Sequence, residues 1–344
     1  MRRFIRLAIA AGAVVSALAF SGSAWAAYSP SLTVTSQRNA PGAQTAILLG
    51  HVQTAADDPT AKDTIYAPLG YGVNLSQAAG TKIGDVSARI ILRNAGNAEV
   101  DVEGQVVADN PALYLNNPCT RNPSPHGAVW KLNISIAGTP QTIPIYVDAV
   151  TAGPEATFAS AKIQLCLPGP TATSVGAQLL FAFFDVNGVF TNPSNTQDRI
   201  WHATFTPNFP GTQTPNPAGT TEGQALVPGR VSLSIKSKSL KKGRVTISGK
   251  LLVDGRPYRG AVIELFVPAR GGFRKVAETR TNAKGIYTFR RKIKKKTRFD
   301  VQVLELADLA LPCPGTPLPG VPQGCRTATI SFFAFNRVTA RRKR

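Results

Sequence analysis

The sequence predicts an all-β protein with two β-sandwich domains that follow an export signal. The 344 residues include 30 Gly and 26 Pro but a single Met, a composition typical of many short strands joined by turns. Apolar and polar residues alternate in one segment after another, and long amphipathic helical patterns are absent. The charge also divides the chain into two parts. We therefore expect a larger N-terminal sandwich over 27–206, a connecting segment over 207–230 and a C-terminal sandwich over 231–344.

The first 26 residues predict a signal peptide. Arg2, Arg3 and Arg6 form a basic head, an Ala-rich apolar run follows, and Ala-Trp-Ala at 24–26 fits a small-residue cleavage site. The apolar run is about 14 residues long, and a helix needs roughly 20 to span a bilayer, so an uncleaved anchor is the less favoured alternative. We expect a mature chain that starts near Ala27, lacks a transmembrane span, and is secreted or associated with the cell surface.

Segments with strand character fill the chain from residue 28 to residue 205. A turn at 94–97 joins two of them as a hairpin. Nine or ten strands at this spacing suggest a sandwich of two sheets. The segments are 31–36, 45–52, 86–92, 100–107, 129–136, 142–147, 161–167, 177–184 and 200–205.

Residues 207–230 differ in composition from both flanking regions. They hold five Pro and four Gly and show no hydrophobic periodicity. We interpret them as an interdomain linker, with a long covering loop as the alternative. A linker of this kind would let the two domains move independently.

Strand patterns resume at residue 231, with turn residues between them. Seven short strands in about 110 residues match one Ig-like or transthyretin-like sandwich. The segments are 231–235, 244–253, 261–267, 275–281, 286–290, 298–304 and 327–335.

A family resemblance lies in this second region. Residues 247–265 (ISGKLLVDGRPYRGAVIEL) and 279–289 (TRTNAKGIYTF) resemble the bacterial Ig-like and carboxypeptidase-regulatory-like (transthyretin-like) modules, with Asn282 where Asp is commoner. The similarity covers 231–305 and implies a β-sandwich of the kind that serves as a stalk, adhesion unit or carbohydrate-binding-like appendage, without catalytic residues. The N-terminal half loosely resembles uncharacterised secreted bacterial proteins, which implies nothing about its chemistry.

The four cysteines agree with export. Two pairs allow three connectivities. We expect Cys119–Cys166 and Cys313–Cys325, because each pairing keeps its bridge within one part of the chain. A metal site would need tighter Cys/His spacing.

Positive charge is concentrated in the C-terminal part. Residues 27–225 carry 9 Lys+Arg against 13 Asp+Glu, whereas residues 226–344 carry 27 against 6. The segment 290–298 alone holds seven cations, and Lys236, Lys238 and further basic residues precede it. A field of this size attracts polyanions.

We weigh three interpretations of these cations. They bind an anionic cell-envelope polymer or polysaccharide, they stay solvated and aid solubility, or they bind nucleic acid. Export and the lack of interleaved aromatic residues count against nucleic acid, which we do not expect. The candidate polyanion-binding residues are Arg290, Arg291, Lys292, Lys294, Lys295, Lys296, Arg298, Arg341, Arg342, Lys343 and Arg344.

Catalytic motifs are hard to find. The chain has three histidines, His51, His126 and His202, and no G-x-S-x-G nucleophile elbow. His126 lies in a predicted loop. We interpret His51 and His202 as two isolated structural or surface imidazoles, with their convergence in the fold as the alternative. We therefore expect no catalytic residue and no cofactor, and keep a secreted hydrolase as the least favoured alternative.

Calcium and sugars are two other possible ligands. Asp57, Asp58 and Asp63 form the densest acidic segment, which is either a Ca²⁺ loop or, as we favour, a solvated loop. Sugar binding would need exposed aromatic faces. Trp130 and Trp201 alternate with apolar residues and should be buried, whereas Tyr66 and Tyr71 lie in a Gly/Pro-rich stretch and should be exposed.

We therefore expect a secreted, non-enzymatic binding or structural protein, with a carbohydrate-binding protein as the second hypothesis.

Overall fold

The structure is a computed structural model that describes residues 28–136, 138–168, 177–270, 272–309 and 312–343. The predicted signal peptide, 1–26, lies outside the described residues. The all-β prediction is confirmed, since the described chain consists of strands, turns and single-turn 3₁₀ helices. Those helices are Arg93–Ala95, Pro111–Tyr114, Pro154–Thr157, Pro217–Gly219 and Lys241–Gly243.

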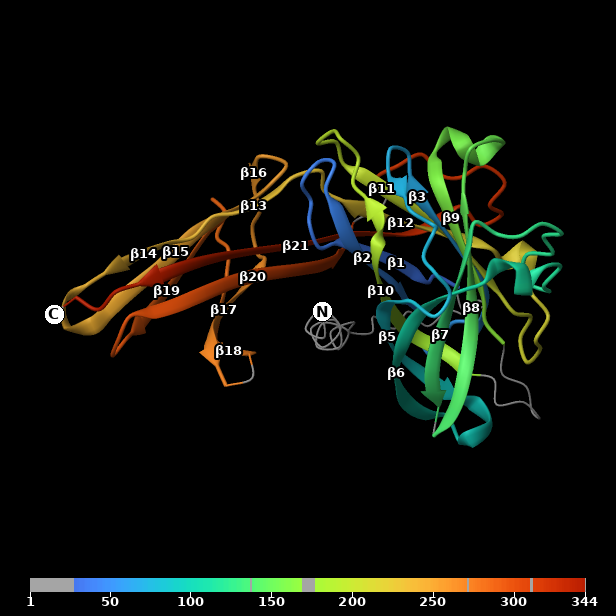
Figure 1. Cartoon of the computed structure of the whole chain (residues 1–344), viewed down its shortest axis with the longest axis horizontal. Coiled ribbons are helices and arrows are strands. Elements are labelled where there is room, and N and C mark those ends of the chain that lie inside the picture. The colour runs from blue at the N-terminus through green and yellow to red at the C-terminus, as the bar shows by residue number, and fades with distance from the viewer. Residues whose placement is uncertain (1–27, 137, 169–176, 271, 310–311, 344) are drawn as a thin grey trace, which may run out of the picture.

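Most strands belong to one large sheet of 16 strands (Figure 1). Its order is β1-β2-β10-β5-β6-β7-β8-β9-β3-β11-β12-β21-β20-β17-β18, with β4 paired to β10. The strands are β1 (Ser31–Ser36), β2 (Gln44–Val52), β3 (Thr60–Pro68), β4 (Gly72–Val73), β5 (Lys82–Leu92), β6 (Ala98–Asp109), β7 (Ala128–Ile136), β8 (Thr139–Ala149), β9 (Ala159–Cys166), β10 (Ala177–Thr191), β11 (Arg199–Pro207), β12 (Thr221–Val227), β17 (Val262–Ala269), β18 (Gly272–Arg280), β20 (Thr297–Asp308) and β21 (Cys325–Ala340).

A second sheet of five strands is built around β15. Strands β13 and β16 pair with its C-terminal half, while β14 and β19 pair with its N-terminal half. The five strands are β13 (Val231–Leu233), β14 (Lys236–Ser239), β15 (Arg244–Val253), β16 (Arg256–Pro257) and β19 (Ile286–Lys292).

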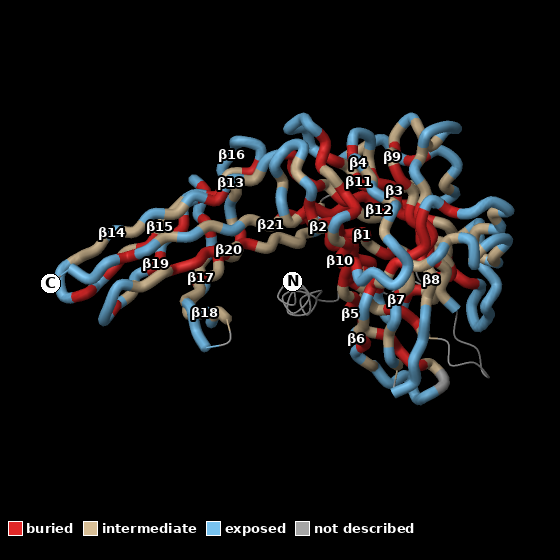
Figure 2. The backbone as a smooth tube through the Cα atoms, in the orientation of Figure 1, coloured by how far each residue is buried: buried red, intermediate tan, exposed pale blue. Residues whose placement is uncertain are grey.

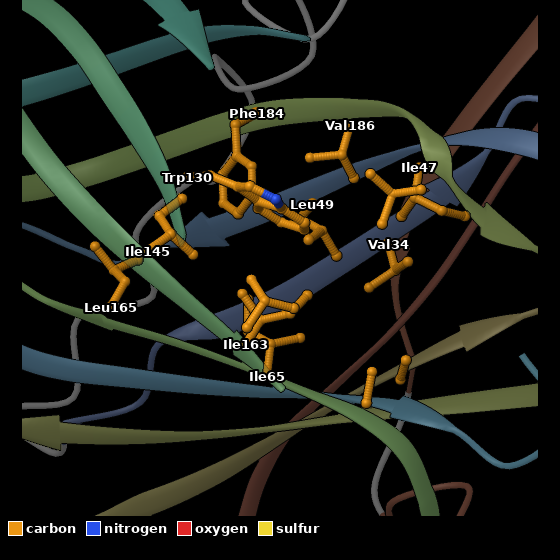
Figure 3. Packing of buried hydrophobic residues seen from close by; sticks show 14 of the residues in the cluster. Val34, Ile47, Leu49, Ile65, Trp130, Ile145, Ile163, Leu165, Phe184 and Val186 are labelled. Carbon is orange, nitrogen blue, oxygen red and sulfur yellow. The ribbon is translucent and has the colours of Figure 1, made fainter. Parts of the chain in front are cut away.

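The first core fills the N-terminal unit, by which we mean residues 28–227 together with 312–331. The large sheet curls around this core, so that residues from β1 to β12 meet in its centre (Figure 3). Trp130 and Trp201 are fully buried there, as the alternation of their strands predicts. The hairpin predicted at 94–97 joins β5 to β6, with Gly96 and Asn97 in the left-handed conformation.

A hydroxyl ladder closes the curled sheet. Strand β1 lies at the edge of the hydrogen-bonded sheet, yet its outer backbone groups are satisfied by side chains of β21. The hydroxyls of Thr327, Thr329 and Ser331 donate to the carbonyls of Pro30, Leu32 and Val34 at 2.8, 2.6 and 2.6 Å. The Ser331 hydroxyl also accepts from the Val34 amide at 3.2 Å. Buried backbone groups need such partners, so the ladder replaces a strand pairing.

The second core lies in the C-terminal unit, defined as residues 231–309 with 332–343. It is a two-layer sandwich in which the five-stranded sheet packs on strands β17, β18, β20 and the end of β21. Ile247, Leu251, Leu265, Val301 and Phe332 are all fully buried between the layers. Figure 2 shows buried and exposed residues alternating along β15 and β19, as expected for strands with one face on a core.

The linker prediction for 207–230 is wrong for its second half. Residues Thr221–Val227 form β12, which pairs antiparallel with β11 and parallel with β21. Six of its seven residues are buried. The first half, which is rich in Pro and Gly, forms a turn that folds back on itself, with an isolated β-bridge between Asn208 and Pro215.

Strand β21 belongs to both units and connects them. Its first residues pair with β12, and from Thr329 to Ala340 it pairs with β20. Figure 1 shows β21 running from the N-terminal strands to the far end of the molecule, where the C-terminus lies. The connection between the two parts is therefore a paired strand as well as the segment that we expected to link them.

Both predicted disulfides are present. Cys119 bonds to Cys166 and Cys313 to Cys325, and no described cysteine is free. The second bridge closes a loop that packs on the N-terminal unit, where Leu318 joins Tyr66 and Ala159 in a small apolar cluster. This loop therefore belongs to the N-terminal unit in space, although it lies in the basic part of the sequence.

Candidate anion-binding face

The outward side of the five-stranded sheet is a basic face. Along β15 the residues Val245, Ile247 and Leu251 point into the core, so those between them point outward. The same alternation applies to β14 and β19. The basic face consists of the cations Lys236, Lys238, Arg244, Lys250, Arg290 and Lys292, all exposed, and the hydroxyl residues Thr246, Ser248 and Thr288, with the exposed apolar Ile286 opposite Lys250.

Strand register arranges these side chains in rows. Thr246 of β15 is opposite Lys238 on one side and Arg290 on the other. Ser248 is likewise flanked by Lys236 and Thr288, and Arg244 is opposite Lys292. Directly opposite residues share a face, so these cations converge on a single surface.

A basic tip adjoins this face at the end of the molecule. Three segments that are distant in sequence meet there through backbone hydrogen bonds: the Gly243 amide donates to the Lys343 carbonyl at 3.3 Å, and the Ile293 amide donates to the Gly243 carbonyl at 2.8 Å. The Ser239 hydroxyl donates to the Arg341 carbonyl at 2.6 Å. The cations of the basic tip are Lys241, Lys242, Lys294, Lys295, Lys296, Arg341, Arg342 and Lys343, all exposed.

Acidic residues are kept away from the basic face. Of the six in residues 226–344, five lie on β17, β18 and β20, in the other layer. Several are paired there: Lys275 bonds Glu264 at 2.8 Å, and Arg337 bonds Asp300 at 2.8 Å. The sixth, Asp254, lies in the turn between β15 and β16. The sandwich therefore has one face of mixed, paired charge and one that is purely cationic.

The structure separates two of the predicted polyanion-binding residues from the rest. Arg291 is opposite Val245 and lies on the inward side of β19, half-buried. Arg298 lies on the other layer, beside Asp300 at 3.4 Å and over the ring of Phe273. Arg344 lies outside the described residues. The other eight lie on the basic face or the basic tip.

The eleven candidate residues did not include six cations that lie on the basic face or the basic tip, and the short strand β14 was missed as a strand. These six are Lys236, Lys238, Lys241, Lys242, Arg244 and Lys250. The signal was present in the alternation Lys-Ser-Lys-Ser at 236–239, in which the two lysines face outward. Ser237 and Ser239 face β21 instead and donate to the carbonyls of Thr339 and Arg341.

Each of the three histidines is paired with a carboxylate and buried. His51 Nδ1 lies 2.9 Å from Asp63 Oδ2, and His126 Nδ1 lies 2.8 Å from Asp148 Oδ2. Burial lowers the pKa of His51, but Asp63 and Gln53 outweigh it, so that pKa lies above its ordinary value. Each imidazole therefore has a carboxylate partner, which the sequence does not reveal.

His202 and His51 do not converge. Trp201 and Ala203 point into the N-terminal core, so His202 between them points to the opposite side of the sheet. There its Nδ1 lies 2.7 Å from Glu222 Oε1, while the Leu318 amide of the disulfide loop donates to Glu222 Oε2 at 2.8 Å. The pair thus fastens that loop to the sheet.

The three candidate calcium ligands have separate roles. Asp57 accepts hydrogen bonds from the Ser29 and Thr54 amides, and Asp63 binds His51. Burial raises the pKa of Asp58, with Asp57 adding to the effect. Among the described residues, no three His, Cys, Asp or Glu side chains are grouped as metal ligands.

The four aromatic residues considered for sugar binding are all buried. Trp130 and Trp201 are fully buried, as predicted, but Tyr66 and Tyr71 are only 9% and 4% exposed, so their predicted exposure is wrong. Tyr71 packs edge-on against Trp201 with ring centroids 5.1 Å apart. The stretch around it reads as a loop because of its Gly and Pro, yet its aromatic side chains complete the core. The carbohydrate-binding hypothesis has thereby lost the residues that motivated it.

Comparison with known proteins leaves the family open. No family model matches the chain, and no curated protein matches it. One solved structure, described as a tetra-tandem repeat in the extending region of a large adhesion protein, matches with 10% identity over 90% of this chain and 99% of that chain, at a TM-score of 0.20. A TM-score this low does not establish a shared fold. The Ig-like and transthyretin-like resemblance of 231–305 thus stays a prediction, while the sandwich architecture is observed.

No helix among the residues that the structure describes is long and apolar enough to cross a membrane.

Proposed function

We propose that this is a secreted, non-enzymatic binding or structural protein whose C-terminal unit associates with an anionic cell-envelope polymer. The observation that carries the proposal is the segregation of charge within one sandwich. Exposed cations from three strands, two turns and the C-terminal tail share one end of the molecule, and the acidic residues lie mainly on the other layer. Simple solvation of charge requires no such separation.

The rest of the proposal rests on the fold. Two disulfides are compatible with an extracellular location. A sandwich that resembles Ig-like or transthyretin-like modules would serve as an attachment unit. Since β21 is shared, the N-terminal unit would be held at a fixed orientation and presented away from the polymer.

A non-enzymatic role is supported by the use of the histidines. Each imidazole is paired with a carboxylate, and Glu222, the partner of His202, also accepts a hydrogen bond from the disulfide loop. A general base must reach its substrate, whereas these buried imidazoles are bonded to carboxylates of the protein itself.

The test is retention of the whole mature chain on isolated cell-envelope material across a salt series. An isolated 226–344 fragment would be unsuitable, because residues 325–331 and the disulfide loop pack on the N-terminal unit. We expect strong retention at 50 mM salt that falls steeply towards 500 mM, and no retention on a neutral glucan. Retention that is absent at low salt, or unchanged by salt, would contradict the proposal.

A further inference from the structure

The cations of the basic face are arranged as two lines with a low floor between them. Strand β14 carries Lys236 and Lys238 on one side, and β19 carries Arg290 and Lys292 on the other. Strand β15 lies between them. Neighbouring strands are about 4.8 Å apart and alternate residues about 7 Å apart, so the lines are about 10 Å apart and each line repeats at about 7 Å.

The floor between the two lines is made of short hydroxyl side chains. Thr246 and Ser248 point outward from β15, each flanked by at least one of the lysines or arginines. Arg244 at one end and Lys250 at the other are six residues apart, which gives a track about 20 Å long at strand rise. The Arg244 end opens on the basic tip.

We propose that this track binds an extended, unbranched phosphodiester polymer that runs parallel to β15. This inference rests on the proposed function and names its ligand. Phosphates at about 7 Å repeats would meet cations of either line in turn, while hydroxyls of the floor donate to their oxygens.

The chemistry of the floor selects the ligand class. Pyranose polymers are bound by apolar or aromatic side chains against the sugar face, and proteins that bind single-stranded nucleic acids add aromatic platforms for the bases to their cations. Tyr287 and Phe289 are buried in the core, so neither ring is available on the track. The exposed apolar side chain beside the track is that of Ile286, opposite Lys250 at one end, and it is aliphatic and lies off the floor formed by Thr246 and Ser248. A flexible polyol-phosphate chain without rings requires only the cations and hydroxyls that are present.

The experiment measures binding of a fluorescent poly(glycerol phosphate) oligomer to the whole mature chain by anisotropy at 0.1 M salt. The first variant, Lys238→Gln/Arg290→Gln, removes the two cations that flank Thr246. Its control, Arg256→Gln/Lys284→Gln, removes two exposed cations of the same unit, one from β16 and one from the turn before β19. Because both carry the same net charge, we expect at least tenfold weaker binding for the first and less than a twofold change for the control.

A second variant tests the track without changing charge. Thr246→Tyr places a ring on the floor, whereas Thr339→Tyr places one at an exposed position of β21 on the other layer. Tyr is favoured in strands, so both variants should fold, and circular dichroism confirms it. We expect Thr246→Tyr to weaken binding at least fivefold and Thr339→Tyr to leave it unchanged.

The outcomes separate the two proposals. If the wild-type chain binds in a salt-dependent way but each variant behaves like its control, the track is overturned and diffuse electrostatic binding remains. Tighter binding of a uronate polymer with equal charge would overturn the phosphodiester class. Tighter binding of oligothymidylate, a phosphodiester that carries bases, would overturn the assignment to a polyol phosphate without rings. If the wild-type chain binds no anionic polymer at low salt, the proposed function itself fails.

Discussion

The hydroxyl ladder between β21 and β1 gives the sharpest prediction about the fold. In Thr329→Val, the hydroxyl that donates to the Leu32 carbonyl at 2.6 Å is replaced by a methyl group of similar size. Thr329 is 2% exposed and Leu32 is fully buried, so water has no access to the carbonyl. An orphaned buried acceptor costs about 1–3 kcal/mol, and we expect that loss in the free energy of unfolding.

Ser331→Ala should cost more, because the Ser331 hydroxyl serves both the amide and the carbonyl of Val34. Two orphaned backbone groups predict about 2–5 kcal/mol. The matched control is Thr339→Val, an exposed threonine on the same strand, whose change should stay within about 0.5 kcal/mol. Urea unfolding followed by tryptophan fluorescence measures all three. If Thr329→Val unfolds at the same urea concentration as Thr339→Val, the ladder does not stabilise the fold as argued.

Three further predictions concern charge and crosslinks. His51→Asn leaves Asp63 buried without its partner, which should lower the free energy of unfolding by about 3–5 kcal/mol. Because the folded pKa of His51 is raised, the stabilisation by this pair is complete below about pH 6.5 and is lost at higher pH. Urea unfolding should therefore show a larger loss for the variant at pH 6 than at pH 9. Burial, and then a hydrogen bond with a neighbouring carboxyl, raises the pKa of Asp254 to about 6. Its ionisation between about pH 4 and 6 therefore destabilises the fold, by less than about 1 kcal/mol in the free energy of unfolding because solvent screens this exposed group. Asp254→Asn should accordingly raise the thermal midpoint at pH 7 but not at pH 4. A disulfide that closes a longer loop restricts the unfolded chain more. Serine replacement of Cys119–Cys166, whose residues are 47 apart, should therefore lower the free energy of unfolding by about 4 kcal/mol, and that of Cys313–Cys325, 12 apart, by about 3 kcal/mol. Urea unfolding measures both, and the reverse order would contradict this argument.

Alternation of apolar and polar residues predicted the strands that have one face on a core, and it failed elsewhere. Strand β15 was predicted at its observed bounds, since its inward residues are apolar and its outward ones polar. Strand β12 was missed because it is buried on both sides, so Glu222 and Gln224 are core residues held by His202 and the disulfide loop. No local pattern in Thr221–Val227 reveals those distant partners.

The candidate site was likewise predictable only in part. The number of cations and their position after residue 226 could be counted from the sequence, and eight of the eleven proposed residues lie on the basic face or tip. Which face each residue occupies depends on strand register, and so Arg291 and Arg298 were grouped with cations from which the fold separates them. The pairing of the histidines with carboxylates likewise depends on tertiary contacts.

The shared strand β21 implies that the two units unfold together. In a chain that starts at Ala27, the tryptophans, Trp130 and Trp201, are both in the N-terminal core and report on that unit alone. Ile247→Ala creates a cavity in the C-terminal core, where Ile247 is fully buried, and should cost about 2–5 kcal/mol. Because loss of that sandwich frees one end of β21, and β21 supplies both the partner of β12 and the hydroxyls that hold β1, the tryptophan transition should also move to lower urea. A tryptophan transition that stays in place, while far-ultraviolet circular dichroism shows a separate earlier step, would mean that the units fold independently despite the strand they share.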